Sequence, residues 1–193
     1  MADPNNAPGI QLPPPPPSSN NKGSSDRNDE VILSDVLGTP RQISIFASFC
    51  RDVSSISQRL DTSGLNTTVL APLNSAISSL PRKPWEDPEE YRVLGDGAYA
   101  GQGGEERAQR NLRRFVEAHV VGVSPWGEGE RVRTVGGEDE GREVWWERDE
   151  AGTVRVMPDG VEVDGVVQRV KNGEVWVLKG VVNYASSDKD GRD

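Results

Sequence analysis

The chain has 193 residues, a formal net charge of −9 and a hydrophobic share of 34%, which is low but ordinary for a globular protein. One histidine and one cysteine exclude a zinc finger, a cysteine-rich metal cluster and an internal disulfide. The acidic balance argues against a nucleic-acid partner, since phosphate contacts need clustered Lys and Arg, and no apolar run approaches the roughly 20 residues that cross a bilayer.

Residues 1–30 are rich in Pro, Asn and Ser and include the run Pro13 to Pro17. So little apolar surface predicts a disordered arm, with the proline run in polyproline II. We favour a spacer, with a ligand for an SH3-type groove as the alternative. The first residues contain no apolar signal segment, so we expect either an intracellular protein or one whose leader has been removed.

Order is expected from Val31, where short apolar stripes with helical spacing begin. They predict one helix that stops near Gly38, a second over about residues 42–51 and a third that Gly64 ends. The run from Thr67 to Leu70 then predicts a buried strand that stops at Pro72. Asn74 is expected to cap the helical turn that follows.

The middle of the chain is rich in proline and glycine. Pro88 suits the start of a helix with two glutamates in its first turn, and residues 95–104, with five glycines, predict a mobile loop. Apolar spacing then predicts a helix from about Glu105 to Ala118.

From Val120 the pattern changes to alternation with a period of two, which predicts several short strands. Asp164-Gly165 and Asn172-Gly173 are read as turns between strands, and Asn172-Gly173 predicts a type I′ hairpin with positive φ at both positions. Helices first and strands after them predict an α+β domain over residues 31–185, with a disordered tail at 186–193. We expect short N-terminal helices packed on a mostly antiparallel β-sheet or sandwich in the C-terminal half.

Three stretches resemble, in the right order, conserved stretches of the fasciclin (FAS1) domain family. The stretches are Thr-Val-Leu-Ala-Pro-Leu-Asn-Ser-Ala-Ile ending at Ile77, Phe-Val-Glu-Ala-His-Val-Val ending at Val121, and Asn-Gly-Glu-Val-Trp-Val-Leu-Lys-Gly-Val-Val ending at Val182. The overall pattern is similar to small fungal single-domain members. This resemblance implies a non-catalytic interaction or adhesion module of the fungal secretory pathway, cell surface or vacuole. It implies a protein or cell-wall glycan partner and no cofactor.

Two departures from the family pattern limit what is carried over. Ala118 stands where the family has Tyr before the histidine, and Lys179 stands where the third stretch has Asp. The chain also has no Asp-Ile pair, so the integrin adhesion linked to animal members is not expected here.

The residues expected to be structural belong to these stretches: Thr68, Asn74, His119, Asn172 and Gly173. We expect His119 to be buried and to hydrogen-bond a polar group of the first stretch, such as Thr68 or Asn74, because a buried ring nitrogen without a partner costs about 1–3 kcal/mol. No metal site is expected, and an enzyme would need a pair of carboxylates for which the spacing gives no signal.

The alternative function is a small-ligand or polysaccharide binder that uses exposed tryptophans. Trp85, Trp126 and Trp145 are the candidates, because aromatic faces supply contact area at low entropic cost. Asn66 begins an N-glycosylation sequon that matters only if the chain enters the secretory pathway. The sequence leaves the partner, the compartment and the oligomeric state open.

Overall fold

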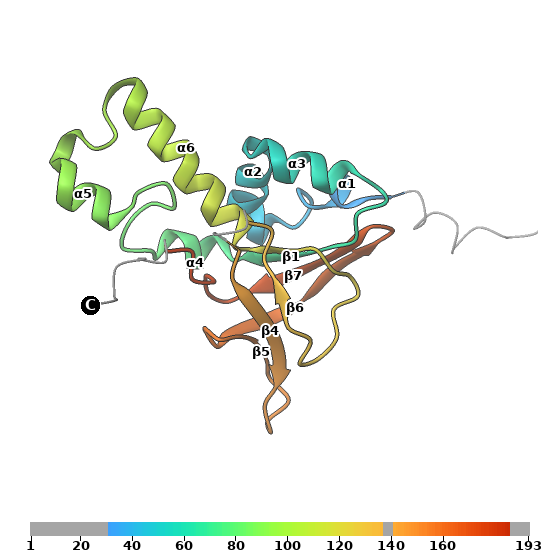
Figure 1. The fold of residues 1–193 in the computed structure, drawn as a ribbon. Helices are drawn as coiled ribbons and strands as arrows, with labels where there is room; N and C mark the ends of the chain where they lie inside the picture. Colours follow the sequence, from blue (N-terminus) through green and yellow to red (C-terminus); the bar gives the residue numbers. More distant parts are fainter. Residues whose placement is uncertain (1–30, 137–140, 186–193) are drawn as a thin grey trace, which may run out of the picture.

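The computed structural model describes residues 31–136 and 141–185, so the predicted arm at 1–30 and tail at 186–193 lie outside the described residues. The helices are α1 (Leu33–Val36), η1 (Arg41–Ile43), α2 (Ser44–Asp52), α3 (Ser54–Asp61), α4 (Asn74–Ser78), α5 (Pro88–Leu94), η2 (Gly95–Gly97) and α6 (Gly101–Glu117). The strands are β1 (Thr67–Pro72), β2 (Val120–Val121), β3 (Val132–Arg133), β4 (Glu143–Arg148), β5 (Val154–Met157), β6 (Val161–Val170) and β7 (Gly173–Leu178). Helices cover one side of a seven-stranded sheet, and α5 and the start of α6 project beyond it (Figure 1).

The sheet has the order β2-β1-β7-β6-β5-β4-β3. All neighbouring strands are antiparallel except β1 and β7, which run parallel at the centre. The two edges approach each other, because Val121 forms a β-bridge with Thr134 and the Val135 N–H donates to the Val120 carbonyl at 2.8 Å. The α+β expectation is confirmed, with a mixed and nearly closed sheet in the C-terminal half.

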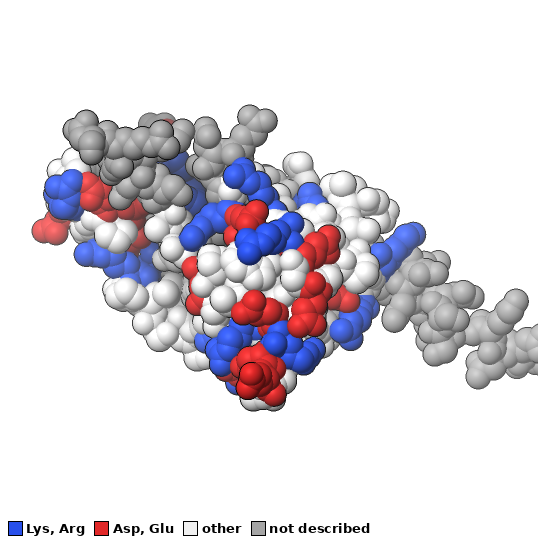
Figure 2. Space-filling model, turned by 60° about the horizontal axis from the view of Figure 1, so that its bottom comes forward, with Lys and Arg blue, Asp and Glu red and all other residues white. Residues whose placement is uncertain are grey.

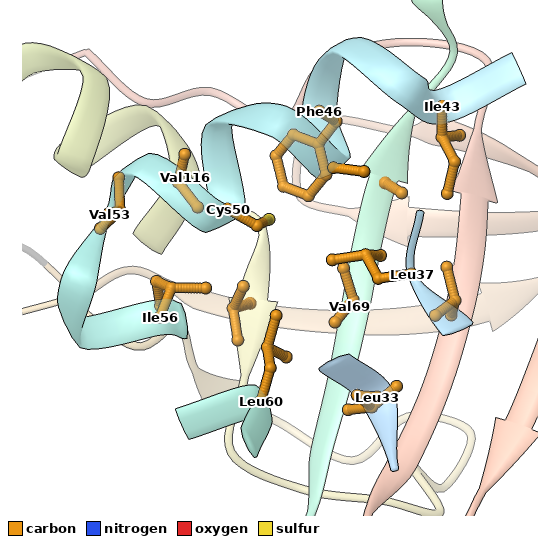
Figure 3. Packing of buried hydrophobic residues seen from close by; sticks show 14 of the residues in the cluster. Leu33, Leu37, Ile43, Phe46, Cys50, Val53, Ile56, Leu60, Val69 and Val116 are labelled. Carbon is orange, nitrogen blue, oxygen red and sulfur yellow. The ribbon is translucent and has the colours of Figure 1, made fainter. Parts of the chain in front are cut away.

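The N-terminal helices pack on the sheet through the stripe that the sequence predicts. Ile43, Phe46, Ala47 and Cys50 recur at helical spacing, and each is 0–1% exposed. Figure 3 shows Ile43, Phe46 and Cys50 on the same side of β1 as Val69, together with residues from α1 and α3. Burial raises the pKa of the Cys50 thiol, so this cysteine is a core residue and not an activated nucleophile.

Strands β1 and β7 are buried on both faces, which explains why β1 reads as a continuous apolar run. Val69 and Val177 belong to the cluster beneath the helices. Leu70 and Trp176 point the other way, into a second cluster between β1, β7 and the outer strands. Strands β1 and β7, which carry the first and third of the three stretches, therefore lie side by side between the two clusters.

Residues 95–104 do not form the predicted loop: they contain η2, and α6 already begins at Gly101. A Cβ at Gly104 would lie 2.2 Å from the Tyr99 carbonyl carbon. Glycine here permits close contact between a helix and the preceding turn, a use that composition cannot distinguish from mobility.

Two predicted turns also differ. Asp164-Gly165 lies inside β6, next to a register shift against β7, so this glycine marks a bulge and not a turn. The β6–β7 hairpin exists, but Lys171 and Asn172 make its turn and neither has positive φ. Gly173 is required for a different reason, because a Cβ there would lie 1.9 Å from the Thr67 carbonyl oxygen.

Candidate functional site

A groove of about 460 Å³ lies between the segment that follows α4, the middle of α6 and the C-terminal segment at residues 183–185. It combines prolines and an aromatic ring with several polar and charged groups. The residues that line it are Pro81, Arg82, Pro84, Glu86, Asp87, Pro88, Glu89, Asn111, Arg114, Asn183, Tyr184 and Ala185.

One wall of the groove begins at the N-terminus of α5. The Asp87 side chain accepts from the Glu89 N–H at 2.8 Å, and Pro88 occupies the first helical turn, where no N–H partner is needed. The predicted helix start at Pro88 is therefore confirmed. None of the residues of α5 is buried, so apolar packing does not hold this helix against the domain.

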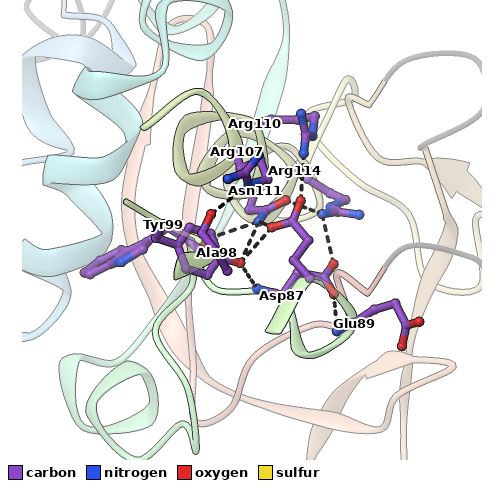
Figure 4. Close-up of polar contacts among 10 residues, drawn as sticks. Asp87, Glu89, Ala98, Tyr99, Arg107, Arg110, Asn111 and Arg114 are labelled. Carbon is purple, nitrogen blue, oxygen red and sulfur yellow. Dashed lines mark hydrogen bonds and ion pairs between the residues drawn. The ribbon is translucent and has the colours of Figure 1, made fainter. Parts of the chain in front are cut away.

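A polar network joins α5 to α6 instead (Figure 4). The Tyr99 hydroxyl donates to Glu90 Oε2 at 2.7 Å and accepts from the Asp87 N–H at 2.6 Å. Asn111, which is 2% exposed, donates from Nδ2 to Glu90 Oε2 at 2.8 Å and to the Trp85 carbonyl at 3.1 Å. These bonds fix the wall of the groove before any partner arrives.

The same contacts set the ionisation of the network. Burial raises the pKa of Tyr99 to about 12, and the nearby Glu90 carboxylate adds to this rise. Burial alone would raise the pKa of Glu90, but hydrogen bonds from Tyr99, Asn111 and Arg110 outweigh it and lower the pKa. At neutral pH Tyr99 is therefore a neutral donor to a charged carboxylate, which is a strong type of hydrogen bond.

Arg114 connects this network to the groove. Its Nη2 donates to Asn111 Oδ1 at 2.5 Å and lies 3.3 Å from Asp87 Oδ2. The side chain is 17% exposed, so a guanidinium is held in place at the floor of the groove with only part of it in contact with solvent.

The opposite wall is the C-terminal segment. The Tyr184 ring packs edge-on against Phe115 at 4.8 Å between centroids. The Asn183 N–H donates to Asp159 Oδ2 at 2.8 Å, and Arg142 Nη1 donates to the Asn183 carbonyl at 2.9 Å. The Val182 N–H donates to His119 Nε2 at 3.0 Å, so the histidine holds the residue that precedes this wall.

His119 is buried as expected, but its partners are not Thr68 or Asn74. Its Nδ1 lies 2.7 Å from the Phe115 carbonyl, and its own carbonyl accepts from the Leu70 N–H at 2.8 Å. The prediction of Thr68 or Asn74 was wrong because β7 lies next to β1 and brings the chain after β7 to the histidine. The local sequence does not show that β1 pairs with β7.

Thr68 and Asn74 have other roles in the structure. Thr68 is fully buried and donates from Oγ1 to the Val123 carbonyl at 2.7 Å. Asn74 does not cap α4, because Leu73 occupies the N-cap position. Its amide instead accepts from the Ile45 N–H at 3.0 Å and donates to the Arg41 carbonyl at 2.8 Å, which joins the turn after β1 to η1 and α2.

Asn172 is fully buried and makes three hydrogen bonds to the N-terminal helices. Its Oδ1 accepts from the Leu33 N–H at 2.8 Å, and its Nδ2 donates to the carbonyls of Leu60 and Thr62 at 3.0 and 3.2 Å. Together with Gly173 it fixes the β6–β7 turn against α1 and the end of α3.

The candidate tryptophans do not form one exposed surface. Trp126 is only 4% exposed and packs on Trp176 at 5.7 Å, so it is a core residue and the expectation of an exposed ring was wrong. Trp145 is half-buried beneath the Arg131 guanidinium, which lies 3.9 Å from its ring centroid. Trp85 packs edge-on against Phe49 in the helical half.

A second groove, of about 580 Å³, lies beside Trp126, Trp146 and Trp176. Each of these indole N–H groups already donates to a protein oxygen, so none is left for a ligand. Figure 2 shows acidic and basic side chains interspersed over the face around the outer strands, with no continuous basic strip.

Asn66, the sequon residue, is exposed just before β1. Among residues 31–136 and 141–185, no group of three or more His, Cys, Asp or Glu side chains is placed to hold a metal ion. In the same part of the chain, no helix combines the length and the apolar character that crossing a membrane requires.

Sequence reasoning missed the groove. Tyr99, Asn111, Arg114 and Tyr184 come from three separate segments, and only the fold brings them together. One signal was available: Asn111 is a polar residue on the otherwise apolar face of α6, next to Leu112 and one turn before Phe115.

Comparison with known proteins gives fungal relatives over most of the chain. A FAS1 domain-containing protein of Neurospora crassa is 58% identical over 153 residues, which are 79% of this chain and 65% of that protein. FAS1 domain-containing proteins of Aspergillus fumigatus and Emericella nidulans are 49% and 46% identical over 81% of this chain, and the matches cover 65% and 63% of those proteins. The chain thus spans just under two thirds of the length of these relatives. No protein-family model matches it.

Among solved structures, the FAS1 domain pair of the insect cell adhesion molecule fasciclin I is similar, with a TM-score of 0.53 at 11% identity. The match covers 80% of this chain and 51% of the insect chain. At this identity the likeness shows the fold, so the described residues form a fasciclin-type domain. With the fungal relatives, it confirms the resemblance to the fasciclin (FAS1) domain family that was read from the three stretches.

Proposed function

We propose that this domain is a non-catalytic interaction module and that its groove beside Tyr184 receives an extended segment of a protein partner. The observation that carries this proposal is a preformed groove in which prolines and Tyr184 supply apolar contact area over the fixed Arg114 guanidinium. A groove whose polar groups are already held in place loses little entropy on binding, which favours recognition.

The geometry favours a peptide over a reacting substrate. The acidic groups at the groove are engaged in structural bonds: Asp87 caps α5 and contacts Arg114, while Glu89 pairs with Arg92. The groove residues therefore offer contacts that position a chain, and none of them is arranged as a general base beside a nucleophile.

We extend the proposal to adhesion in the fungal secretory pathway, at the cell surface or in the vacuole. The insect structural neighbour is a cell adhesion molecule, and the exposed position of Asn66 would accommodate a glycan. If the chain passes through the secretory pathway, endoglycosidase treatment of the protein purified from a fungus should increase its mobility, and Asn66→Gln should abolish that change. An unglycosylated protein from the native host would contradict this extension.

The experiment for the groove is selection from a phage-displayed random peptide library with the full chain, followed by titration of the selected synthetic peptides. We expect Tyr184→Ala to weaken binding at least about tenfold, since it removes one aromatic anchor. Trp145→Ala, which alters an aromatic side chain on a separate strand, is the matched control and should leave the affinity unchanged. The melting temperature of each variant verifies folding.

The proposal fails if the selected peptides bind Tyr184→Ala and the unmodified chain equally well. The alternative, a small-ligand or polysaccharide binder, is tested on the same protein with a glycan array. A defined glycan that shifts tryptophan fluorescence, together with no peptide selected at the groove, would replace the peptide proposal with that function.

A further inference from the structure

The two partners of the His119 ring fix its protonation state. The Phe115 carbonyl can only accept, so Nδ1 carries the proton, while the Val182 N–H can only donate, so Nε2 is the bare acceptor. The neutral ring satisfies both partners. A second proton on Nε2 would bring two N–H donors face to face at the present separation of 3.0 Å.

We propose that His119 is an acid-operated latch: protonation of its Nε2 releases the Val182 N–H and frees the segment at residues 182–185 from the domain. Because Asn183, Tyr184 and Ala185 line the groove, release removes one of its walls. The latch follows from the His119 contacts alone, and its effect on binding rests on the function proposed above.

The segment is suited to local release. It has no regular secondary structure and is separated from β7 by residues 179–181. Apart from the His119 bond, it is held by the packing of Val182 in the second cluster, by the Asp159 and Arg142 contacts of Asn183 and by the ring contact of Tyr184. Val182 itself is 1% exposed, so the released state is a minor population at neutral pH.

The surroundings of the ring oppose protonation in the closed state. Phe46 of α2 and Phe115 of α6 pack on it, with ring centroids 5.5 and 4.7 Å away. Burial lowers the pKa of His119 to about 4, although the Phe115 carbonyl and the negative charge of Asp159 both act to raise it.

The other titratable and charged groups on these elements are neutral in the relevant range or engaged elsewhere. Cys50 on α2 has a raised pKa, and so does Tyr184 in the segment itself, so both stay neutral. Glu117 on α6 accepts from the Ser55 hydroxyl at 3.0 Å. Arg142, the residue before β4, donates to the Asn183 carbonyl. In the closed state His119 therefore stays neutral at mildly acid pH, and protonation of its Nε2 accompanies release of the segment.

Amide hydrogen exchange in the full chain, followed by NMR, tests the latch. Release exposes Nε2 and moves the His119 pKa toward its ordinary value of 6.5, so acidification from about pH 7.5 to about pH 5 should raise the opening constant at the Val182 amide by up to about thirtyfold. The rates are corrected for the intrinsic pH dependence of exchange. The Val175 amide of β7 is the internal reference, because its exchange reports opening of the central sheet.

His119→Gln is the matched variant, since a glutamine can place an amide oxygen near the Nε2 position without titrating. We expect the Val182 amide of this variant to respond less than about threefold to the same acidification. Asp159→Asn should raise opening at both pH values and keep their ratio, because it removes a charged acceptor but not the titrating ring. An unchanged Val182 opening constant in the unmodified chain, or an equal rise in His119→Gln, overturns the proposal.

Peptide titration at the same two pH values separates the latch from the function of the groove. Affinity that falls at the lower pH in the unmodified chain but not in His119→Gln supports both. A Val182 amide that responds to acid while no peptide binds the groove at either pH supports the latch and overturns the proposed function alone.

Discussion

Asn172 shows how a single amide can join three parts of a fold. Its three hydrogen bonds reach α1, the end of α3 and the residues after α3, and the bonds to Leu33 and Leu60 are buried. The side chain therefore joins the N-terminal helices to the β6–β7 turn by hydrogen bonds.

Asn172→Ala should lower the free energy of unfolding by about 3 kcal/mol, because it leaves the buried Leu33 N–H and the Leu60 carbonyl without their side-chain partner. Urea denaturation measures the change. Asn66→Ala, at an exposed position, is the control and should change stability by less than about 0.5 kcal/mol. A loss below about 1 kcal/mol for Asn172→Ala would show that the bonds contribute little.

Gly173 and Gly165 provide a matched pair of glycine substitutions. A Cβ at Gly173 would lie 1.9 Å from the Thr67 carbonyl oxygen, whereas a Cβ at Gly165 meets nothing within 4 Å. We expect Gly173→Ala to destabilise the chain by more than about 3 kcal/mol and Gly165→Ala to cost less than about 1 kcal/mol. Thermal melting of the two variants gives the comparison, and similar melting temperatures would refute the close approach of β7 to β1.

At the scale of elements, the arm of α5 and η2 is attached differently from the rest of the molecule. The N-terminal helices are held by a buried apolar stripe, while α5 buries no residue and is bonded to α6 through Tyr99, Glu90 and Asn111. Regions with few buried apolar contacts open locally before the whole domain unfolds. The arm is therefore the part of the groove wall that a polar substitution can loosen selectively.

Tyr99→Phe should raise the hydrogen-exchange rates of α5 and of the first turns of α6, with a local cost of about 1–2 kcal/mol and little change in melting temperature. It removes the donor to Glu90 and leaves the Asp87 N–H without its acceptor. Tyr91→Phe, on α5, is the control. Exchange rates that stay the same in Tyr99→Phe would mean that the network does not hold the arm.

Elements with a strong local pattern were predictable, and pairings between distant segments were not. Phe46 and Cys50 revealed α2 through their spacing, and Pro72 ended β1 where it was expected to. The parallel pairing of β1 with β7 joins residues about a hundred positions apart, and helical or strand periodicity carries no information about it. The partner of His119 and the groove both depend on that pairing, which is why neither was found from sequence.

At the scale of the whole molecule, the junction at His119 connects both halves of the fold. Its carbonyl bonds β1, its ring packs between α2 and α6, and its Nε2 holds the chain that leaves β7. A neutral ring at this junction makes global stability depend on pH. The folded-state pKa of about 4 lies below the ordinary value of 6.5, so the unfolded chain binds more protons between these values and stability falls as pH decreases through this window.

The most direct measurement is the free energy of unfolding by urea at several pH values, for the unmodified chain and for His119→Gln. Between about pH 7 and about pH 5, we predict that the stability advantage of the unmodified chain over the variant shrinks by about 2 kcal/mol, at up to about 1.4 kcal/mol per pH unit. Carboxylates titrate alike in both proteins, so the difference isolates the histidine. A difference that stays constant across this range, or grows toward acid pH, would contradict a buried neutral His119 at the centre of the fold.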